Sequence, residues 1–331
     1  MYRLLGLVGS GSRGAFLLVI SLVCADTTVK DPASFCLNPN FVDRKPPLLQ
    51  NAPPAPSEGW LEVLFAASRN KNVIEIGGPS LGLLPRTFYS MAKRYDNVVE
   101  HQHDEWQKED HKKKLFTNDF RADGAHLKKV ASTGFYDTLV SSHNLEHFPD
   151  PLRALAEWNR VVKPGGLLVL FLPYAPTTFD HRREPHSFAH LLADWANPTR
   201  ARHELDLNET IAAWDVTQDP GLEGGDEQAK RAYLLSRFRR KGDNFMHWHV
   251  FTPALMQQLA ECMNASVVEG PFVRGNTMHT VLKTGGLLYG RPANEAGQQA
   301  SRASTLQALR KSFRASDFHT FVSRRFRAAD Q

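Results

Sequence analysis

The sequence predicts an α/β protein with a doubly wound, mostly parallel sheet, and two segments carry that prediction. Residues 73–80 (VIEIGGPS) form an apolar, β-branched run that ends in an acid and two glycines. Residues 136–173 have the pattern of a strand, a polar loop, a helix, a Pro-Gly-Gly turn and another apolar strand. Strands that alternate with helices favour a parallel sheet, and such sheets bind ligands beyond the carboxyl ends of their strands, where the strand order reverses.

The individual elements follow from hydrophobic periodicity and from turn and capping residues. Strands are expected at residues 72–77, 97–101, 116–120, 136–142, 167–172, 265–269 and 277–283. Helices are expected at residues 58–70, 83–95, near 125–131, at 151–162 and at 253–263. Asp150 and Thr252 are suited to cap the last two helices, each followed by a proline at the first helical position. The last two strands are joined by too few residues for a crossover helix, so we expect them to be antiparallel.

Length and composition indicate one large domain with extensions at both ends. The chain has 331 residues and is 42% hydrophobic, an ordinary globular balance. We expect a targeting segment at residues 1–25 and a proline-rich arm at 26–57. The domain proper is expected at 58–290, with a polar insertion at 174–250, and a basic, helical tail at 291–331.

The first residues have the pattern of a signal peptide. Arg3 and Arg13 precede an apolar run that ends in Val23-Cys24-Ala25. The run is shorter than the roughly 20 apolar residues that span a bilayer. We therefore expect entry into the secretory or endomembrane system or another organelle, with an uncleaved anchor or a bipartite organelle signal as alternatives. If the segment is not used, the protein is cytoplasmic, and no other segment is expected to cross a membrane.

Charge and cysteine content say little about partners. The net charge of +5 is concentrated in the C-terminal tail, which we interpret as a solvated surface helix and not as a specific nucleic-acid interface. Beyond the targeting segment, Cys36 and Cys262 allow one disulfide. The sequence leaves the oligomeric state open.

The first candidate ligand loop begins at the end of the first strand and contains Glu75, Gly77 and Gly78. Glycines let the backbone approach a ligand where a side chain would clash. Glu75 is placed either to accept hydrogen bonds from an ammonium group or to fix the loop. The spacing, with Pro79 next, does not fit G-x-G-x-x-G, which counts against NAD or FAD.

Acidic residues follow the next two strands. Glu100 ends the second strand, where a carboxylate can accept hydrogen bonds from both hydroxyls of a ribose, and His101 is the alternative polar group there. Asp123, followed by Gly124, is placed to accept from the exocyclic amine of a purine.

The loop after the fourth strand begins with Ser142, His143 and Asn144. His143 and His147 are four residues apart and are candidates for a general base. The alternative is that either histidine serves only packing or hydrogen bonding.

With these motifs the chain resembles the class I S-adenosylmethionine-dependent methyltransferases of the methyltransferase type 11 kind. Residues 73–80 are similar to the family's first glycine motif, and residues 122–125 to its adenine-side acidic motif. Residues 141–166 are very like its fourth-strand loop, helix and Pro-Gly-Gly turn. The resemblance covers residues 73–173 and implies a seven-stranded Rossmann-like methyltransferase fold with an antiparallel last strand. It also implies S-adenosyl-L-methionine as the cofactor.

The resemblance assigns expected roles to the loop residues. Glu75, Gly77 and Gly78 would hold the methionine end, Glu100 and His101 the ribose, Asp123 and Gly124 the adenine, and Ser142, His143 and Asn144 the methyl-transfer face. The chain departs from the family pattern at residues 79–81, which replace further glycines, and at 101–103, where His-Gln-His follows Glu100. A cofactor-binding module without turnover is therefore an alternative, and a NAD or nucleotide-sugar enzyme a weaker one.

The insertion is expected to act as a lid above the ligand. Its candidates for binding a small-molecule or glycan acceptor, anionic or hydroxylated, are Arg182, Arg183, His186 and His190. Asp194, His247 and His249 would complete ligand sets for a divalent ion, but their spacing matches no strong metal motif, so no metal is predicted.

The predicted chemistry is methyl transfer to an oxygen or nitrogen of that acceptor. Because the cofactor carries the reactive carbon, the protein has to align the acceptor with the methyl group and exclude water. An oxygen acceptor benefits from a base, and we expect His143 or His147 to orient or deprotonate the hydroxyl.

Overall fold

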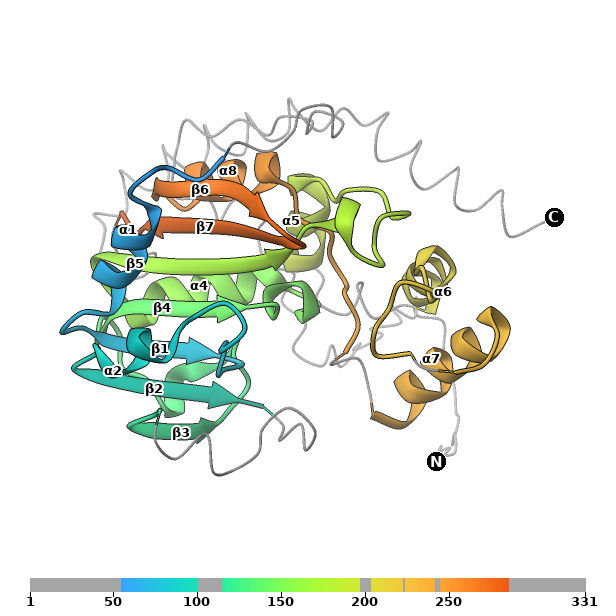
Figure 1. The fold of residues 1–331 in the computed structure, drawn as a ribbon, viewed down its shortest axis with the longest axis horizontal. Coiled ribbons are helices and arrows are strands. Elements are labelled where there is room, and N and C mark those ends of the chain that lie inside the picture. The colour runs from blue at the N-terminus through green and yellow to red at the C-terminus, as the bar shows by residue number, and fades with distance from the viewer. Residues whose placement is uncertain (1–54, 101–114, 197–203, 223, 242–244, 286–331) are drawn as a thin grey trace, which may run out of the picture.

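The computed structural model describes residues 55–100, 115–196, 204–222, 224–241 and 245–285 (Figure 1). The targeting segment, most of the proline-rich arm, the basic tail and His101 lie outside the described residues. The predictions made for them therefore stay predictions.

The core is a seven-stranded sheet with the order β3-β2-β1-β4-β5-β7-β6 (Figure 1). The strands are β1 Asn72–Ile76, β2 Arg94–Val99, β3 Asn118–Arg121, β4 Tyr136–Ser142, β5 Val162–Pro173, β6 Ser266–Arg274 and β7 Thr277–Lys283. The first five are parallel, whereas β7 runs antiparallel to both β5 and β6. The predicted fold class and the antiparallel last pair are confirmed, and the strand order reverses between β1 and β4.

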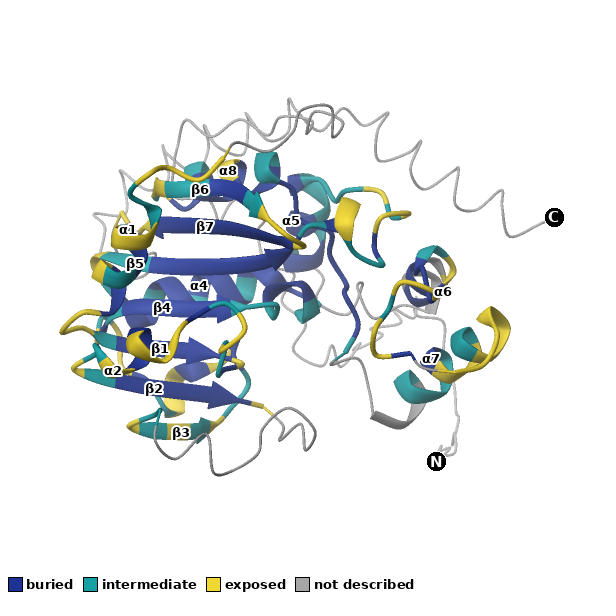
Figure 2. Ribbon diagram, in the orientation of Figure 1, coloured by how far each residue is buried: buried dark blue, intermediate teal, exposed yellow. Residues whose placement is uncertain are grey.

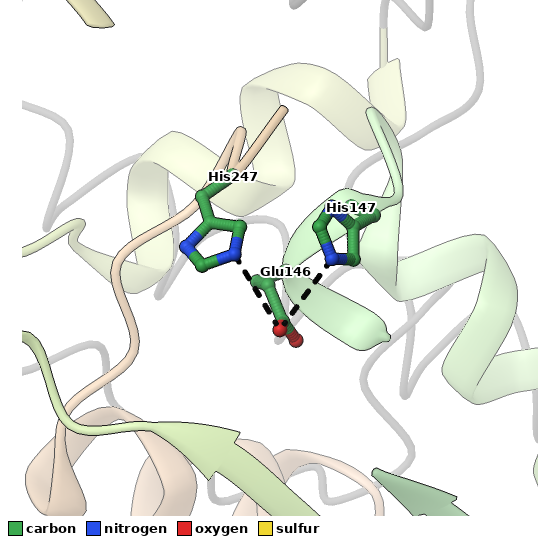
Figure 3. A group of neighbouring side chains, drawn as sticks. All are labelled: Glu146, His147 and His247. Atoms are coloured by element: carbon green, nitrogen blue, oxygen red, sulfur yellow. Dashed lines mark ion pairs between the residues drawn. The ribbon is translucent and has the colours of Figure 1, made fainter. Parts of the chain in front are cut away.

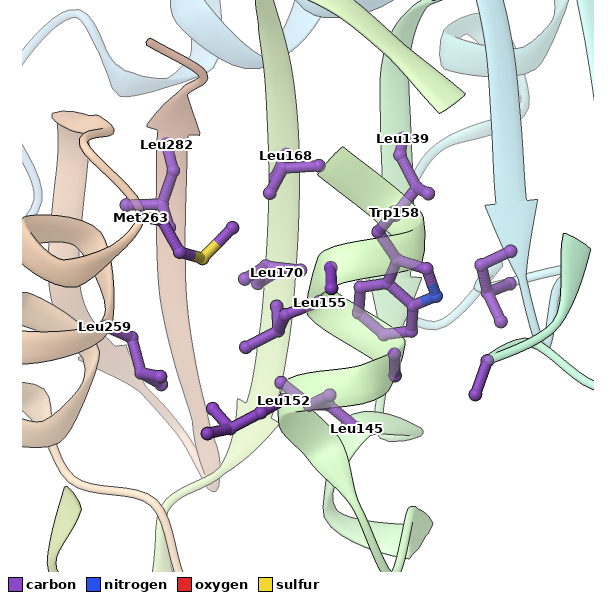
Figure 4. Close-up of a cluster of buried hydrophobic side chains, with 14 of the residues drawn as sticks. Leu139, Leu145, Leu152, Leu155, Trp158, Leu168, Leu170, Leu259, Met263 and Leu282 are labelled. Atoms are coloured by element: carbon purple, nitrogen blue, oxygen red, sulfur yellow. The ribbon is translucent and has the colours of Figure 1, made fainter. Parts of the chain in front are cut away.

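The inner strands β1, β2, β4, β5 and β7 bury side chains on both faces, and consecutive apolar residues enter two different cores. Val73, Val140 and Val169 face α1 (Trp60–Ser68) and α2 (Arg86–Ser90). On the other face lie α4 (Pro151–Val161) and α8 (Pro253–Cys262). Figure 4 shows this second core, where Leu residues of β4 and β5 meet Trp158 of α4 and Leu259 of α8. Helices on both faces hold the carboxyl edge of the parallel strands in place.

Two predicted helices are shorter in the structure. The helix expected over 83–95 ends with α2 at Ser90, and the second strand begins at Arg94, earlier than predicted. Asp96 looks like a surface residue in sequence but is fully buried, because its carboxylate accepts from Arg94 Nε at 2.6 Å and from Tyr136 Oη at 2.8 Å. Near 125–131 the structure has only a 3₁₀ turn, Leu127–Lys129.

The predicted helix caps are confirmed. Asp150 accepts a hydrogen bond from Arg153 N at 3.0 Å, and Thr252 accepts one from Leu255 N at 3.1 Å. Such caps satisfy amide groups that have no partner within the helix. At the end of α8, Cys262 is disulfide-bonded.

The insertion after β5 contains α5 (Phe188–Ala196), α6 (Glu204–Ala213) and α7 (Glu227–Lys241). Its outer part has a small core of its own around Trp214 and Trp248. In Figures 1 and 2, α6 and α7 lie beyond the carboxyl edge of the parallel strands. Within the described residues, no helix is both long enough and apolar enough to span a bilayer.

Candidate functional site

The loops after β1 and β4 touch at the point where the strand order reverses. Gly77 follows β1, is exposed, and has a φ of +80°, a left-handed conformation that favours glycine. A Cβ added at Gly77 would lie 3.2 Å from Asn144 Cγ, and Asn144 Nδ2 donates to Ile76 O at 3.4 Å. The predicted glycine loop and the predicted methyl-transfer loop are therefore neighbours, at the place where such sheets bind ligands.

Glu75 is buried beneath the glycine loop, with its carboxylate engaged by the protein. Its Oε1 accepts from Ser80 Oγ at 2.5 Å and Ser80 N at 3.0 Å, and its Oε2 accepts from Tyr95 Oη at 3.1 Å. Burial raises the pKa of Glu75 to about 7, although these hydrogen bonds act in the opposite direction. Of the two roles considered for this acid, the geometry favours fixing the loop.

Gly78 packs directly on that carboxyl group. A Cβ at Gly78 would lie 2.3 Å from Glu75 Cδ, so only glycine fits without moving a buried, hydrogen-bonded side chain. Asn97 of β2, which the sequence did not single out, accepts from Gly78 N at 3.0 Å and donates to Asp119 Oδ1 at 2.8 Å. A buried amide that bonds the loop backbone is recognisable in sequence only as a polar residue inside a strand.

The predicted ribose and adenine residues lie on the same edge of the sheet. Glu100 directly follows β2 and is exposed. Asp123, after β3, is half-buried, accepts from Ala125 N at 2.8 Å and pairs with His126 Nδ1 at 2.6 Å. Gly124 is closely packed, since a Cβ there would lie 2.8 Å from Ile76 Cγ2. Their roles toward a cofactor stay predictions.

His143 and His147 lie at the two ends of a short segment that includes the 3₁₀ turn Leu145–His147. His143 Nε2 is 2.9 Å from Thr277 Oγ1, and His147 Nδ1 is 3.0 Å from Met246 O. Burial, with a smaller contribution from the charge of His247, lowers the pKa of His143 to about 4 and that of His147 to about 3. Both rings are therefore neutral at neutral pH and have a nitrogen lone pair to offer.

Between them lies Glu146, a buried acid that the sequence analysis missed. Its Oε1 is 3.7 Å from His147 Nε2, 3.9 Å from His247 Nε2 and 4.0 Å from His143 Nδ1 (Figure 3). Neither oxygen has a hydrogen-bond partner among the described residues, and burial raises the pKa of Glu146 to about 7. We call Glu146, His147 and His247 the Glu146 cluster. An acid-histidine pair directly after a strand is the signal that could have indicated it.

A second group of histidines around a carboxylate lies nearby in the insertion. His190 Nε2 and His249 Nε2 lie 3.1 Å and 3.0 Å from Asp194 Oδ2, which are hydrogen-bond distances. Burial opposes ionisation of Asp194, but the bonds from both rings outweigh it and lower the pKa of Asp194. We call His190, Asp194 and His249 the Asp194 cluster.

The other predicted acceptor-binding residues have partners within the protein. Arg183 donates to Asp180 Oδ1 at 3.0 Å and to two backbone carbonyls of residues 247–248, at 2.5 and 3.2 Å. Arg182 is exposed and pairs with Asp215 at 2.9 Å, while His186 Nδ1 accepts from Val250 N at 2.9 Å. The structure thus uses Arg183 as a brace for the strand-like segment that carries His247, and acceptor binding by the others stays a prediction.

Comparison with known families gives one match. The family model described as "Methyltransferase domain" matches residues 86–170, from the start of α2 into β5. The match covers less than half of the chain, and it agrees with the resemblance to class I S-adenosylmethionine-dependent methyltransferases that the motifs suggested. S-adenosylmethionine is the cofactor of that family. A comparison with curated proteins finds no match.

Solved structures show distant similarity only. An S-adenosylmethionine-dependent methyltransferase from Mesorhizobium loti is 13% identical, with 69% of this chain and 98% of that chain covered and a TM-score of 0.40. CalH, solved in complex with SAH, is 11% identical over 68% of this chain and 54% of its own, with a TM-score of 0.38. The CurJ carbon methyltransferase is 13% identical over 66% of this chain, with a TM-score of 0.35. The match spans only 49% of the CurJ structure and about half of the CalH structure.

Proposed function

We propose that this protein transfers the methyl group of S-adenosylmethionine to an oxygen or nitrogen of a small-molecule or glycan acceptor. The observation that carries the proposal is the convergence of three loops of a methyltransferase domain at the reversal point of the sheet. The glycine loop follows β1, Glu100 follows β2, and the loop with Asn144 follows β4, and these strands are adjacent in the order β2-β1-β4.

In this proposal the cofactor lies across the ends of these strands. The methionine end lies at Gly77, where the exposed backbone without a side chain permits close approach. Glu100 accepts from the ribose hydroxyls, and Asp123 lies on the adenine side. Glu75 contributes indirectly, because its bonds to Ser80 and Tyr95 fix the loop.

The acceptor is expected between this edge and the insertion. The segment 247–251 is tied to the loop after β4, since Trp248 N donates to Glu146 O at 2.8 Å. The insertion therefore helps to exclude water and to orient the acceptor, which is the protein's main task in a direct displacement. For an oxygen acceptor, His143 or His147, both neutral at neutral pH, would orient or deprotonate the hydroxyl.

Calorimetric titration of the full chain with S-adenosylhomocysteine tests the cofactor site. We expect one molecule bound per chain, and a weakening of about 10-fold in Glu100→Ala, because one charged hydrogen-bond acceptor is lost. Glu62→Ala, which removes an exposed acid on α1, is the matched control and should bind normally. A folded protein that binds no cofactor would instead indicate a module that has lost the activity.

The acceptor is best sought among ligands that remain on the purified protein. Mass spectrometry of the released small molecules would detect cofactor and acceptor together. A hydroxylated or amine compound that gains one methyl group on incubation with protein and S-adenosylmethionine would identify the substrate class.

We also propose that the N-terminal segment directs the protein into an oxidising compartment. The disulfide at Cys262 supports this, since disulfides persist mainly in such compartments. Sequencing the N-terminus of the mature protein checks it: cleavage after residue 25 is expected, and an intact Met1 on a protein that does not sediment with membranes would contradict it.

A further inference from the structure

We infer that the Glu146 cluster is a binding site for a divalent transition-metal ion such as Zn²⁺, held by Glu146 Oε1, His147 Nε2 and His247 Nε2. This departs from our expectation from the sequence, which assigned no metal. The site joins the loop after β4 to the end of the insertion, about a hundred residues later in the chain.

The spacing of the three atoms suits a shared ion better than a direct bond. The nitrogens of His147 and His247 lie 3.7 Å and 3.9 Å from Glu146 Oε1, beyond hydrogen-bond range. Ligand atoms about 2.1 Å from a tetrahedral zinc lie roughly 3.4 Å from one another, so a small contraction would complete the site. All three atoms already lie within 4.8 Å of one another.

The buried carboxylate independently indicates a missing ligand. The side chain of Glu146 is fully buried, and its two oxygens have no hydrogen-bond partner in the described part of the chain. Burying an unpaired carboxylate is costly, and proteins normally offset that cost with a hydrogen bond, an opposite charge or a metal. A cation at Oε1 would satisfy it.

The outer nitrogens of both rings are fixed in the manner typical of metal sites. His247 Nδ1 bonds Asp180 Oδ2 at 2.5 Å, and His147 Nδ1 bonds the carbonyl oxygen of Met246 at 3.0 Å. In each ring this leaves Nε2 as the free nitrogen, aimed at Glu146 (Figure 3). Metal-binding histidines usually donate their other N–H to a carboxylate or carbonyl, which fixes tautomer and orientation.

The ligand set indicates which ions fit. Two imidazole nitrogens and one carboxylate suit Zn²⁺ and neighbouring transition metals, whereas Mg²⁺ and Ca²⁺ prefer oxygen ligands alone. Three protein ligands leave a position open, and His143 Nδ1 lies nearby, 4.0 Å from the same oxygen. With Nε2 of His147 on the ion, His143 is the histidine that remains available as the base of the proposed function. A part for the ion in polarising an acceptor hydroxyl rests on the proposed function, whereas the binding site does not.

Titration of the full chain, stripped with a chelator, with ZnCl₂ tests the inference. We expect one tight equivalent, and a weakening of about 100-fold or more in His247→Ala and in Glu146→Gln. His190→Ala is the matched control, because it removes a histidine beside a buried carboxylate in the Asp194 cluster, where the distances are those of hydrogen bonds. It should bind zinc like the wild type.

Two results would overturn the inference. One is a folded wild-type protein without a stoichiometric zinc site. The other is a site that survives in both His247→Ala and Glu146→Gln but is lost in His190→Ala, which would place the ion at the Asp194 cluster. Circular dichroism of each variant confirms folding.

The same samples separate this inference from the proposed function. Zinc binding without binding of S-adenosylhomocysteine would sink the methyltransferase proposal and leave the metal site standing. Cofactor binding without zinc binding would contradict the metal site and leave the methyltransferase proposal standing.

Discussion

Glu75 lies in β1 and Glu146 follows the neighbouring strand β4; both are fully buried, and both have a pKa raised to about 7 by burial. Their surroundings differ. Glu75 accepts hydrogen bonds from Ser80 and Tyr95, whereas Glu146 has three imidazole nitrogens at 3.7–4.0 Å and no hydrogen bond among the described residues. The difference shows that burial and a raised pKa do not by themselves identify a binding residue. The partners of the carboxylate distinguish an acid that fixes a loop through hydrogen bonds, as Glu75 does, from one that is available to bind a metal ion.

The largest expected effect comes from truncating the two acids in metal-free protein. Glu75→Ala leaves buried donors of Ser80 and Tyr95 without their acceptor. Glu146→Ala breaks no hydrogen bond and removes a carboxylate whose near partners are imidazole nitrogens at 3.7–4.0 Å. We expect Glu75→Ala to have a free energy of unfolding about 3 kcal/mol lower than that of Glu146→Ala. Urea unfolding in EDTA measures the difference. Equal stabilities of the two variants would contradict the different roles that we assign to Glu75 and Glu146.

Added zinc should stabilise Glu75→Ala but not Glu146→Ala. At a free zinc concentration of 100 times its Kd, the wild type should gain about 2.7 kcal/mol of stability, because the ion binds only the folded site. Glu146→Ala should gain nothing, while Glu75→Ala, which leaves the metal ligands in place, should gain as much as the wild type. Thermal unfolding with and without zinc checks this, and a gain in Glu146→Ala would point to zinc bound elsewhere.

The pH dependence of metal-free protein sharpens the comparison further. A carboxyl whose pKa rises from 4.5 to about 7 on folding lends stability that is present below about pH 4.5 and lost as the pH rises through 7. Glu146→Gln keeps the shape without the charge. Its stability relative to wild type should therefore increase between pH 4.5 and 7, by about 3 kcal/mol at most. If the difference in free energy of unfolding between Glu146→Gln and wild type stays constant across this range, ionisation of Glu146 does not destabilise the folded protein.

The smallest effect on zinc affinity is expected from replacing Asp180, which bonds the outer nitrogen of the metal ligand His247. Asp180→Asn weakens the bond that orients His247 and should lower zinc affinity about 10-fold. Asp194→Asn, in the cluster whose carboxylate is already satisfied, should leave zinc affinity unchanged. Competition titration with a zinc chelator compares the two, and a larger loss in Asp194→Asn would favour the other cluster.

The fold was predictable because its signals are local. The strand, loop, helix and Pro-Gly-Gly turn of residues 136–173 lie within one stretch, and the caps at Asp150 and Thr252 act on amides three residues away. The early start of β2 was not predictable in this way. Asp96 and Asn97 are buried in that strand only because Tyr136, Asn118 and Asp119 supply partners from other strands.

The placement of the candidate loops was predictable to a similar extent, whereas the roles of their residues stay predictions. Gly77, Glu100 and Asn144 could be assigned to one edge, because parallel strands end together. Glu146 could not, because its significance depends on His247 and on Asp180 behind it, which are remote in sequence and placed by the insertion. Arg183 was expected to bind an acceptor, but only the fold shows its bonds to the segment of His247.

The most direct test of the contrast between these acids is the anomalous diffraction of a zinc-soaked crystal, measured above the zinc absorption edge. Our account predicts a single strong peak about 2.0–2.2 Å from His147 Nε2, His247 Nε2 and a carboxylate oxygen of Glu146. It predicts no peak at Glu75. A crystal with no peak at Glu146, or with its only peak at the Asp194 cluster, would contradict it.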